Sequence, residues 1–291
     1  MDSVYLGCPL WAHPPWKGLF FSARADRDAF LPEYARVFDT TEGNATFYGL
    51  PAPETVVRWA QQAPPSFRFC FKFPRGVSHD RMLEGAEAET SAFFERLSPL
   101  RGRLGPFFLQ LHERFGSDRL PVLERYLDQL PKEHAYAVEV RSAAFFRKGE
   151  PETRLNGLLA DRGVNRVIFD TRGLFASPAT DAFTVDAKRK KPRLPVRLIA
   201  TGSAPFVRFV GDPQVERNDG ALRVWAQVVA KWMDEGRTPY VFLHHPDDAH
   251  APELARRFHR LLHETSPQRV PPPARWPAED DTKPEVQLSL F

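Results

Sequence analysis

The sequence predicts an α/β fold, a single (β/α)₈ barrel, from two observations. First, eight short strand-like runs alternate with amphipathic, helix-like segments, which favours parallel strands because these need crossovers of a dozen or more residues. Second, the length of 291 residues suits one barrel plus a tail, since such a barrel commonly needs about 250 residues. The predicted strands are residues 4–10, 36–42, 67–73, 107–112, 136–141, 166–170, 206–210 and 240–245.

The segments between these runs mostly read as helices, and Pro53 with Glu54 in the first turn is typical of a helix start. Residues 171–205 have no clean helical period and predict an irregular connection between strands 6 and 7, with at most short helices. Residues 266–291 are rich in Pro and charge and predict a disordered tail after a barrel domain of residues 1–265. The predicted helices are residues 26–35, 53–62, 86–100, 117–129, 152–162, 220–235 and 250–263.

Composition excludes few functions but indicates the cellular compartment. The 42% hydrophobic content is ample for a buried core, and a net charge of +3 does not by itself predict binding to nucleic acid or membranes. The two cysteines, Cys8 and Cys70, lack metal-type spacing and suggest a reducing compartment. No basic segment followed by an apolar one opens the chain, and no apolar stretch approaches membrane-spanning length, so we expect a cytoplasmic protein.

Polar residues on one face of the predicted strands indicate a site. In RFCFKF, Arg68, Cys70 and Lys72 share a face because strand side chains alternate, so Lys72 should look into the barrel. These residues lie toward the C-terminal ends of their runs, where barrels of this type assemble catalytic groups. The same reading selects Glu42, Gln110, His112, Glu139, Arg141, Asp170, Arg208 and His244.

Several motifs in these elements resemble those of the YecE-like family of bacterial and archaeal proteins, catalogued as domain of unknown function 72. The resemblance spans roughly residues 4–263 and implies a TIM-barrel fold, while the family's biochemical activity is not established. Two departures are Gly43, in place of a hydrophobic residue, and the segment 244–248, in place of an Asn-rich ending. The motifs are GCPLWAHPPWKGLFF at 7–21, EGNATFY at 42–48, FKFPRGVSHD at 71–80, GPFFLQL at 105–111, AVEVRSAAFF at 137–146 and VRFVG at 207–211.

Residue type and position, together with the resemblance, which adds Asn44 and His79, suggest two sets of roles. The expected catalytic residues, with Glu139 or Glu42 as general base, are Glu42, Lys72, His79, Glu139 and Asp170. The expected substrate-binding residues are Asn44, Tyr48, Gln110, Arg141, Arg208, His244 and Trp16, in which Trp16 and Tyr48 form a stacking wall for a base or sugar. The alternative is a buried ion-pair network that merely fills the barrel mouth.

Two further questions stay open at this level. A divalent metal is a candidate cofactor, with Glu42, Glu139, Asp170 and His79 as candidate ligands, although no local metal-binding spacing supports it. Lys72 is a candidate Schiff-base nucleophile if its pKa is low. The alternative favoured by the sequence is an ion pair between Lys72 and Glu139, which would keep the amine protonated and unreactive.

Two segments outside the strands suggest contacts with anions and partners. KRKKPR at 188–193 carries five positive charges in the irregular connection, where a basic lid would attract phosphate. QLSLF at 287–291 resembles the peptide with which bacterial replication and repair proteins bind the sliding clamp, so a DNA repair link is a hypothesis. Its expected partner-binding residues are Gln287, Leu288, Leu290 and Phe291.

The sequence therefore leaves three hypotheses for function. The favoured one is an enzyme acting on a phosphate-bearing or nucleic-acid-derived substrate in a polar pocket at the strand C-termini. The second is a non-catalytic module that binds nucleic acid or a protein partner. The third is an isomerase or aldolase acting on sugars, unrelated to DNA.

Overall fold

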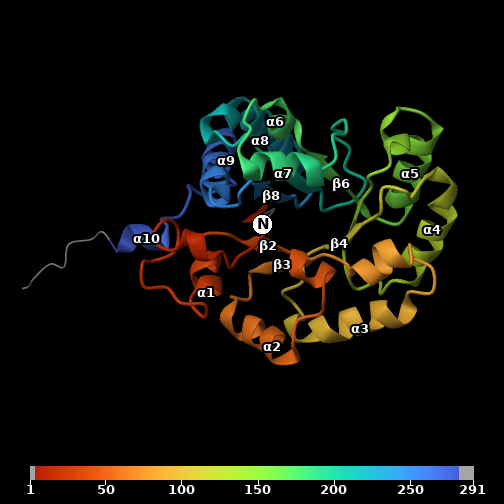
Figure 1. Cartoon of the computed structure of the whole chain (residues 1–291), viewed down its shortest axis with the longest axis horizontal. Coiled ribbons are helices and arrows are strands. Elements are labelled where there is room, and N and C mark those ends of the chain that lie inside the picture. Colours follow the sequence, from red (N-terminus) through yellow and green to blue (C-terminus); the bar gives the residue numbers. More distant parts are fainter. Residues whose placement is uncertain (1–3, 282–291) are drawn as a thin grey trace, which may run out of the picture.

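A computed structural model describes residues 4–281 and contains eight parallel strands surrounded by helices (Figure 1). Neighbouring strands follow the order β3-β2-β1-β8-β7-β6-β5-β4. Between β3 and β4 the ring is joined by two isolated bridges, Phe69–Leu104 and Lys72–Phe108. The strands are β1 (Tyr5–Cys8), β2 (Thr40–Gly43), β3 (Arg68–Phe71), β4 (Phe107–Gln110), β5 (Tyr136–Glu139), β6 (Asn165–Asp170), β7 (Phe206–Val210) and β8 (Tyr240–His244). The predicted (β/α)₈ barrel is confirmed.

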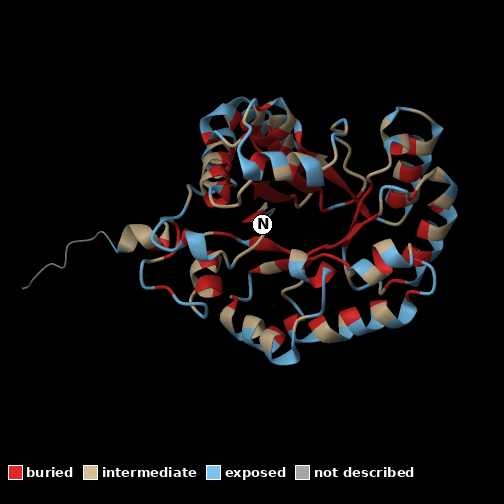
Figure 2. Ribbon diagram, in the orientation of Figure 1, coloured by how far each residue is buried: buried red, intermediate tan, exposed pale blue. Residues whose placement is uncertain are grey.

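Helices follow the strands as the periodicity predicts, and their apolar faces pack on the outside of the barrel (Figure 2). The irregular connection between β6 and β7 contains only two helices, α6 and α7, also as predicted. The helices are α1 (Phe30–Ala35), α2 (Pro53–Gln62), α3 (Glu87–Leu97), α4 (Leu120–Gln129), α5 (Glu150–Asp161), α6 (Arg172–Ala176), α7 (Ala182–Lys190), α8 (Asp219–Asp234), α9 (Ala251–Thr265) and α10 (Pro277–Asp280).

The predicted start of the disordered tail is wrong, because residues 266–281 pack against the barrel. Val270 is 2% exposed, and the Trp276 ring meets Phe20 edge-on at 5.6 Å between centroids. The backbone amide of Ala278, in α10, donates to the carbonyl of Phe20. A few apolar anchors thus order a Pro-rich segment whose overall composition predicts disorder. The clamp-like motif at 287–291 lies outside the described residues and stays a prediction.

The barrel interior is layered. The layer nearer the N-terminal ends of the strands is apolar and contains Cys70, Phe108, Ala137, Val167, Ala204, Phe206, Tyr240 and Phe242. Two residues further along five strands, and therefore on the same face, lie Lys72, Gln110, Glu139, Arg208 and His244. Glu42 takes the equivalent place on β2, two residues after the buried Thr40. The strands thus place a charged layer on an apolar floor, at the C-terminal end of the barrel.

Candidate functional site at the strand C-termini

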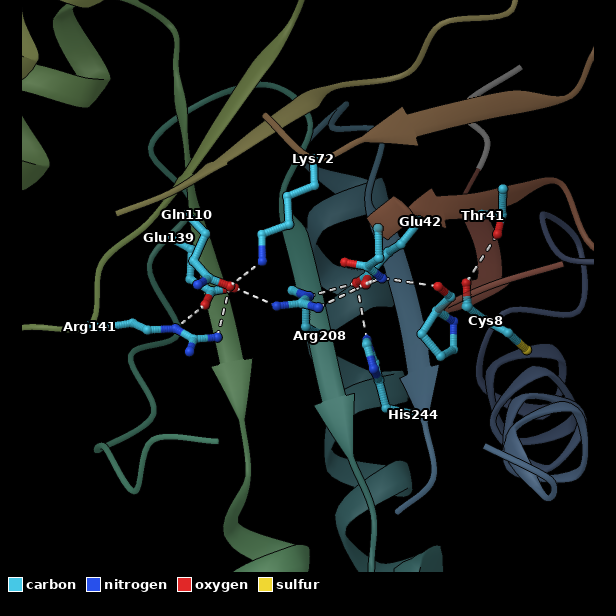
Figure 3. A network of polar contacts seen from close by, with 11 residues as sticks. Cys8, Thr41, Glu42, Lys72, Gln110, Glu139, Arg141, Arg208 and His244 are labelled. Carbon is cyan, nitrogen blue, oxygen red and sulfur yellow. Dashed lines mark hydrogen bonds and ion pairs between the residues drawn. The ribbon is translucent and has the colours of Figure 1, made fainter. Parts of the chain in front are cut away.

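Arg208 is the centre of the charged layer and joins two strands that are distant in sequence. Its Nε and Nη2 donate to the two carboxylate oxygens of Glu42 at 2.7 and 2.8 Å, and its Nη1 donates to Oε2 of Glu139 at 2.6 Å (Figure 3). All three side chains are buried. The two-pronged contact with Glu42 uses the fixed fork of the guanidinium, a geometry that an ammonium cannot reproduce.

Each carboxylate has further donors besides Arg208. Glu42 accepts from Nδ2 of Asn44 at 2.8 Å and contacts Nε2 of His244 at 3.0 Å. Glu139 accepts from Nε of Arg141 at 2.8 Å. The carboxylates of Glu42 and Glu139 are therefore well satisfied by cations and amides, as buried charges must be.

These contacts set the protonation of both carboxylates. Burial alone would raise the pKa of Glu42, but Arg208 and His244 outweigh burial and hold the pKa well below its usual range. For Glu139, burial is likewise outweighed, and Arg141 with Arg208 lowers the pKa to about 2. A carboxylate held so firmly in its ionised form is a weak proton acceptor. The geometry therefore favours an anchoring role for these residues over the predicted role of general base.

Lys72 occupies a different environment from the one the sequence suggests. Its Nζ donates to Oε1 of Gln110 at 2.8 Å and lies 3.8 Å from the centre of the Phe47 ring. Within residues 4–281, no carboxylate lies within ion-pair distance of Nζ, so the expected pair with Glu139 is not formed. Burial and the charge of Arg208 lower the pKa of Lys72 to about 7, against a weaker opposing effect of Glu139.

Gln110 connects Lys72 to the arginine at the end of β5. Its Oε1 accepts from Nη2 of Arg141 at 2.8 Å as well as from Lys72. The side chain of Gln110 is neutral, so it holds both cations in place without compensating either charge. Gln110 and Arg141 thus lie where the sequence predicts.

A cavity of about 470 Å³ opens above this layer. Tyr48, which is 84% exposed, stands at its rim, and Lys191 and Asp248 reach it from loops. The sequence analysis did not select Lys191 as a site residue. The basic run at 188–193, to which Lys191 belongs, was the sequence feature that pointed to it. The cavity is lined by Pro9, Leu10, Trp11, Ala12, Glu42, Asn44, Ala45, Tyr48, Lys72, Lys191, Arg208, His244 and Asp248.

The predicted role of Trp16 as a stacking residue is wrong. Trp16 is fully buried, and its indole Nε1 donates to the backbone carbonyl of Asp248 at 2.9 Å. Its ring packs among Phe20, Phe21 and Tyr34 in the core. A ring without exposed area cannot stack on a ligand, and the tryptophan that lines the cavity is Trp11 instead.

The predicted inward direction of Asp170 is also wrong. Its Oδ2 accepts from indole Nε1 of Trp225, on α8, at 2.8 Å, and its carboxylate pairs with Arg172. Asp170 therefore faces the surrounding helices. The inward residue at the end of β6 is Phe169, whose ring lies 4.9 Å from the guanidinium carbon of Arg208.

His79 lies beside the charged layer rather than in the cavity. It belongs to a π-helical turn, Gly76–Asp80, and its ring meets Phe47 and His112 edge-on, at 4.9 and 5.2 Å between centroids. Partial burial, followed by the charge of Lys72, lowers the pKa of His79 to about 4. His79 is therefore neutral at pH 7 and suited to hydrogen bonding rather than to charge pairing.

The four candidate metal ligands are not brought together. Glu42 and Glu139 are occupied by Arg208, Asp170 faces α8, and His79 lies beside Phe47. Between residues 4 and 281, no three His, Cys, Asp or Glu side chains are grouped so as to hold a metal ion. In the same part of the chain, no helix is both long and apolar enough to span a membrane.

Eight parallel strands with a charged pocket at their C-terminal ends define a protein of the TIM-barrel class. The family model described as "Protein of unknown function DUF72" matches residues 5–279. The chain therefore belongs to the DUF72 family, which confirms the resemblance seen in the sequence.

Relatives and solved structures agree with this assignment. The chain is 44% identical over 265 residues to UPF0759 protein YecE of Escherichia coli (strain K12), over 91% of this chain and 94% of the relative. A DUF72 family protein of Thermotoga maritima has a similar structure, with a TM-score of 0.68 and 24% identity over 90% of this chain and 99% of that one. One from Enterococcus faecalis has a TM-score of 0.66 and 19% identity, over 90% and 98%. These similarities describe the fold and leave the reaction to the site.

Proposed function

We propose that this protein is an enzyme that binds a small phosphate-bearing molecule, such as a nucleotide or a sugar phosphate, in the cavity at the strand C-termini. The observation that carries the proposal is an excess of positive charge in and beside the cavity. Three carboxylates, those of Glu42, Glu139 and Asp248, face the basic groups of Arg141, Lys191, Arg208 and Lys72. Lys72 adds part of a positive charge at pH 7, because its pKa is about 7.

Lys191 is the cation best placed to hold the anionic group. It is half-buried and lines the cavity, and among residues 4–281 no carboxylate lies within ion-pair distance of it. Its neighbour Lys190 differs, because its Nζ pairs with Oδ2 of Asp186 at 2.6 Å and its side chain is exposed. A partly desolvated ammonium without a close counter-ion attracts a phosphate group more strongly than an exposed, paired one.

The shape of the cavity supports an enzyme more than a docking module. Its volume of about 470 Å³ falls within the range of small-molecule sites, about 300–1,000 Å³. Tyr48 at the rim and Trp11 in the wall offer aromatic faces for a base or sugar. Lys72 can both accept and donate a proton at pH 7, because its pKa is about 7.

Replacing Lys191 by Met is expected to weaken binding of AMP by about 10-fold or more, because a hydrogen bond to a charged group contributes about 1.5–3 kcal/mol. Titration calorimetry with AMP, ribose 5-phosphate, adenosine and a short single-stranded oligonucleotide measures this. Lys190→Met is the matched control and should bind as the wild type does. Equal binding of adenosine and AMP, or equal affinity of the two variants, would contradict the proposed anion site.

A second readout separates an enzyme from a binding module. Conversion of the bound phosphate compound is followed by NMR in the wild type and in Lys72→Arg, which keeps the positive charge. The proposal expects turnover in the wild type and its loss, with binding retained, in the variant. Binding without any turnover across a panel of nucleotides and sugar phosphates would favour the non-catalytic module instead.

A further inference from the structure

Lys72 combines three properties that no other residue of the charged layer combines. Its side chain lines the cavity, its Nζ is held by a neutral acceptor, Gln110, and no carboxylate of the described chain lies within ion-pair distance of Nζ. The nearby carboxylates of Glu42 and Glu139 are already engaged by Arg208, a group that does not release its proton in proteins. The charged layer therefore leaves one amine without a counter-ion.

We propose that Lys72 forms a covalent Schiff base with a small anionic aldehyde or ketone bound in this cavity. The inference rests on the proposed function for the anion site and adds the chemical class of the reacting group, a carbonyl. An amine attacks a carbonyl only in its unprotonated form, which a site can favour by burial and by nearby cations. Burial and Arg208 act in this direction on the pKa of Lys72.

The step balances without any further reagent. The lone pair on Nζ forms a bond to the carbonyl carbon, and the electrons of the C=O double bond move to the oxygen, which takes a proton. The nitrogen of this carbinolamine loses a proton, and the hydroxyl, protonated by solvent, leaves as water. The product is a protonated imine, so a protonated lysine and a carbonyl compound give an iminium ion and one water molecule.

The surroundings of Nζ suit this product. The iminium nitrogen keeps the positive charge that the ammonium carries, so Oε1 of Gln110 at 2.8 Å and the face of Phe47 at 3.8 Å can stabilise it in the same way. The ionised carboxylates of Glu42 on β2 and Glu139 on β5 also favour a cation in the layer. Lys191 follows α7 and lines the same cavity, so it is placed to hold a phosphate or carboxylate of the same molecule.

Reductive trapping tests the proposal on the full chain. The protein is incubated at pH 7 with sodium cyanoborohydride and dihydroxyacetone phosphate, pyruvate or neutral glyceraldehyde, and labelled lysines are mapped by mass spectrometry. An ordinary lysine is about 0.04% unprotonated at pH 7. We therefore expect Lys72 to be labelled by dihydroxyacetone phosphate on the order of tenfold to a hundredfold faster than Lys190 in the same chain.

Variants separate this inference from the proposed function. Lys72→Arg should lose the adduct, and Lys191→Met should slow labelling by dihydroxyacetone phosphate while leaving labelling by glyceraldehyde unchanged. If Lys72 is labelled no faster than Lys190 by any of the three probes, the Schiff base is overturned, whether or not AMP binding depends on Lys191. If Lys72 is labelled rapidly but Lys191→Met changes nothing, the covalent role stands and the anion site fails. The comparison of two lysines within the wild-type chain stays decisive even if a variant does not fold.

Discussion

Replacing Arg208 by Met is expected to lower the free energy of unfolding by about 3–5 kcal/mol, the range seen when one partner of a buried ion pair is removed. Arg208 is 6% exposed and donates three hydrogen bonds to Glu42 and Glu139. Without it, two buried carboxylates would keep only the outer contacts with His244, Asn44 and Arg141. The charge left behind, rather than the lost contact, accounts for most of the effect.

Urea unfolding of the purified variant measures this change. Arg154→Met is the matched control, since Arg154 is exposed and its pair with Glu150 is long, at 3.5 Å, so it should change stability by less than about 0.5 kcal/mol. A combined variant, Arg208→Met with Glu42→Gln and Glu139→Gln, should recover part of the loss. A loss as small as that of the control would show that the carboxylates are not held by Arg208.

The pH dependence of the same variant has a defined sign. In the wild type the folded pKa of Glu139, about 2, lies below its ordinary value of 4.5, so its stabilising contribution is complete above pH 4.5 and disappears as the pH falls towards 2. In Arg208→Met the carboxylate of Glu139 keeps only the ion pair with Arg141 and takes up a proton more easily. The difference in the free energy of unfolding between the wild type and Arg208→Met should therefore become smaller as the pH is lowered from 6 to 4.

Replacing Lys72 by Met is expected to stabilise the protein at pH 6 and to have little effect at pH 10. The folded pKa of Lys72, about 7, lies below the ordinary value of 10.5, so the unfolded chain binds more protons between these values. The wild type therefore gains stability as the pH rises from 7 to 10.5, and the penalty of the buried ammonium is largest below pH 7. Each pKa unit corresponds to about 1.4 kcal/mol. After allowing for the lost hydrogen bond to Gln110, we expect a gain on the order of 2–4 kcal/mol at pH 6.

Urea unfolding at pH 6, 8 and 10 follows this difference. Lys190→Met, at an exposed position, should show no comparable pH-dependent gain. A residue that destabilises the fold at neutral pH is typical of functional sites, in which reactivity is maintained at the expense of stability. If Lys72→Met were less stable than the wild type at pH 6, Lys72 would be a structural cation with a normal pKa.

Strand alternation predicted most of the charged layer but not the direction of Asp170. The rule selects inward residues correctly on six strands, from Glu42 on β2 to His244 on β8. On β6 the only polar end residue, Asp170, shares its face with Arg166, which pairs with Glu152 on the outer helices. Val167 and Phe169 form the inward face of β6, so on this strand the apolar residues face the barrel, and alternation alone does not say which of the two faces is inward.

The pairing within the layer could not be derived from the sequence. Alternation places Lys72, Glu139 and Arg208 in one inward-facing layer but does not say which cation each carboxylate contacts. The carboxylates pair with arginine rather than with Lys72, because a planar guanidinium can donate to two oxygens at once. Lys72 donates to Gln110 instead. The sequence therefore predicted which residues make up the charged layer, whereas the pairing of each cation depends on the three-dimensional positions of the side chains.

The most direct test of this account is the titration of the Lys72 amine in the full chain. Trace acetic anhydride is added between pH 5 and 11, and acetylation of the Lys72 peptide is measured by mass spectrometry against that of Lys190. The account predicts a midpoint near pH 7 for Lys72 and a higher midpoint in Arg208→Met, where a freed carboxylate can pair with the amine. A midpoint near pH 10 in the wild type would contradict it, because Lys72 would then be an ordinary charged lysine.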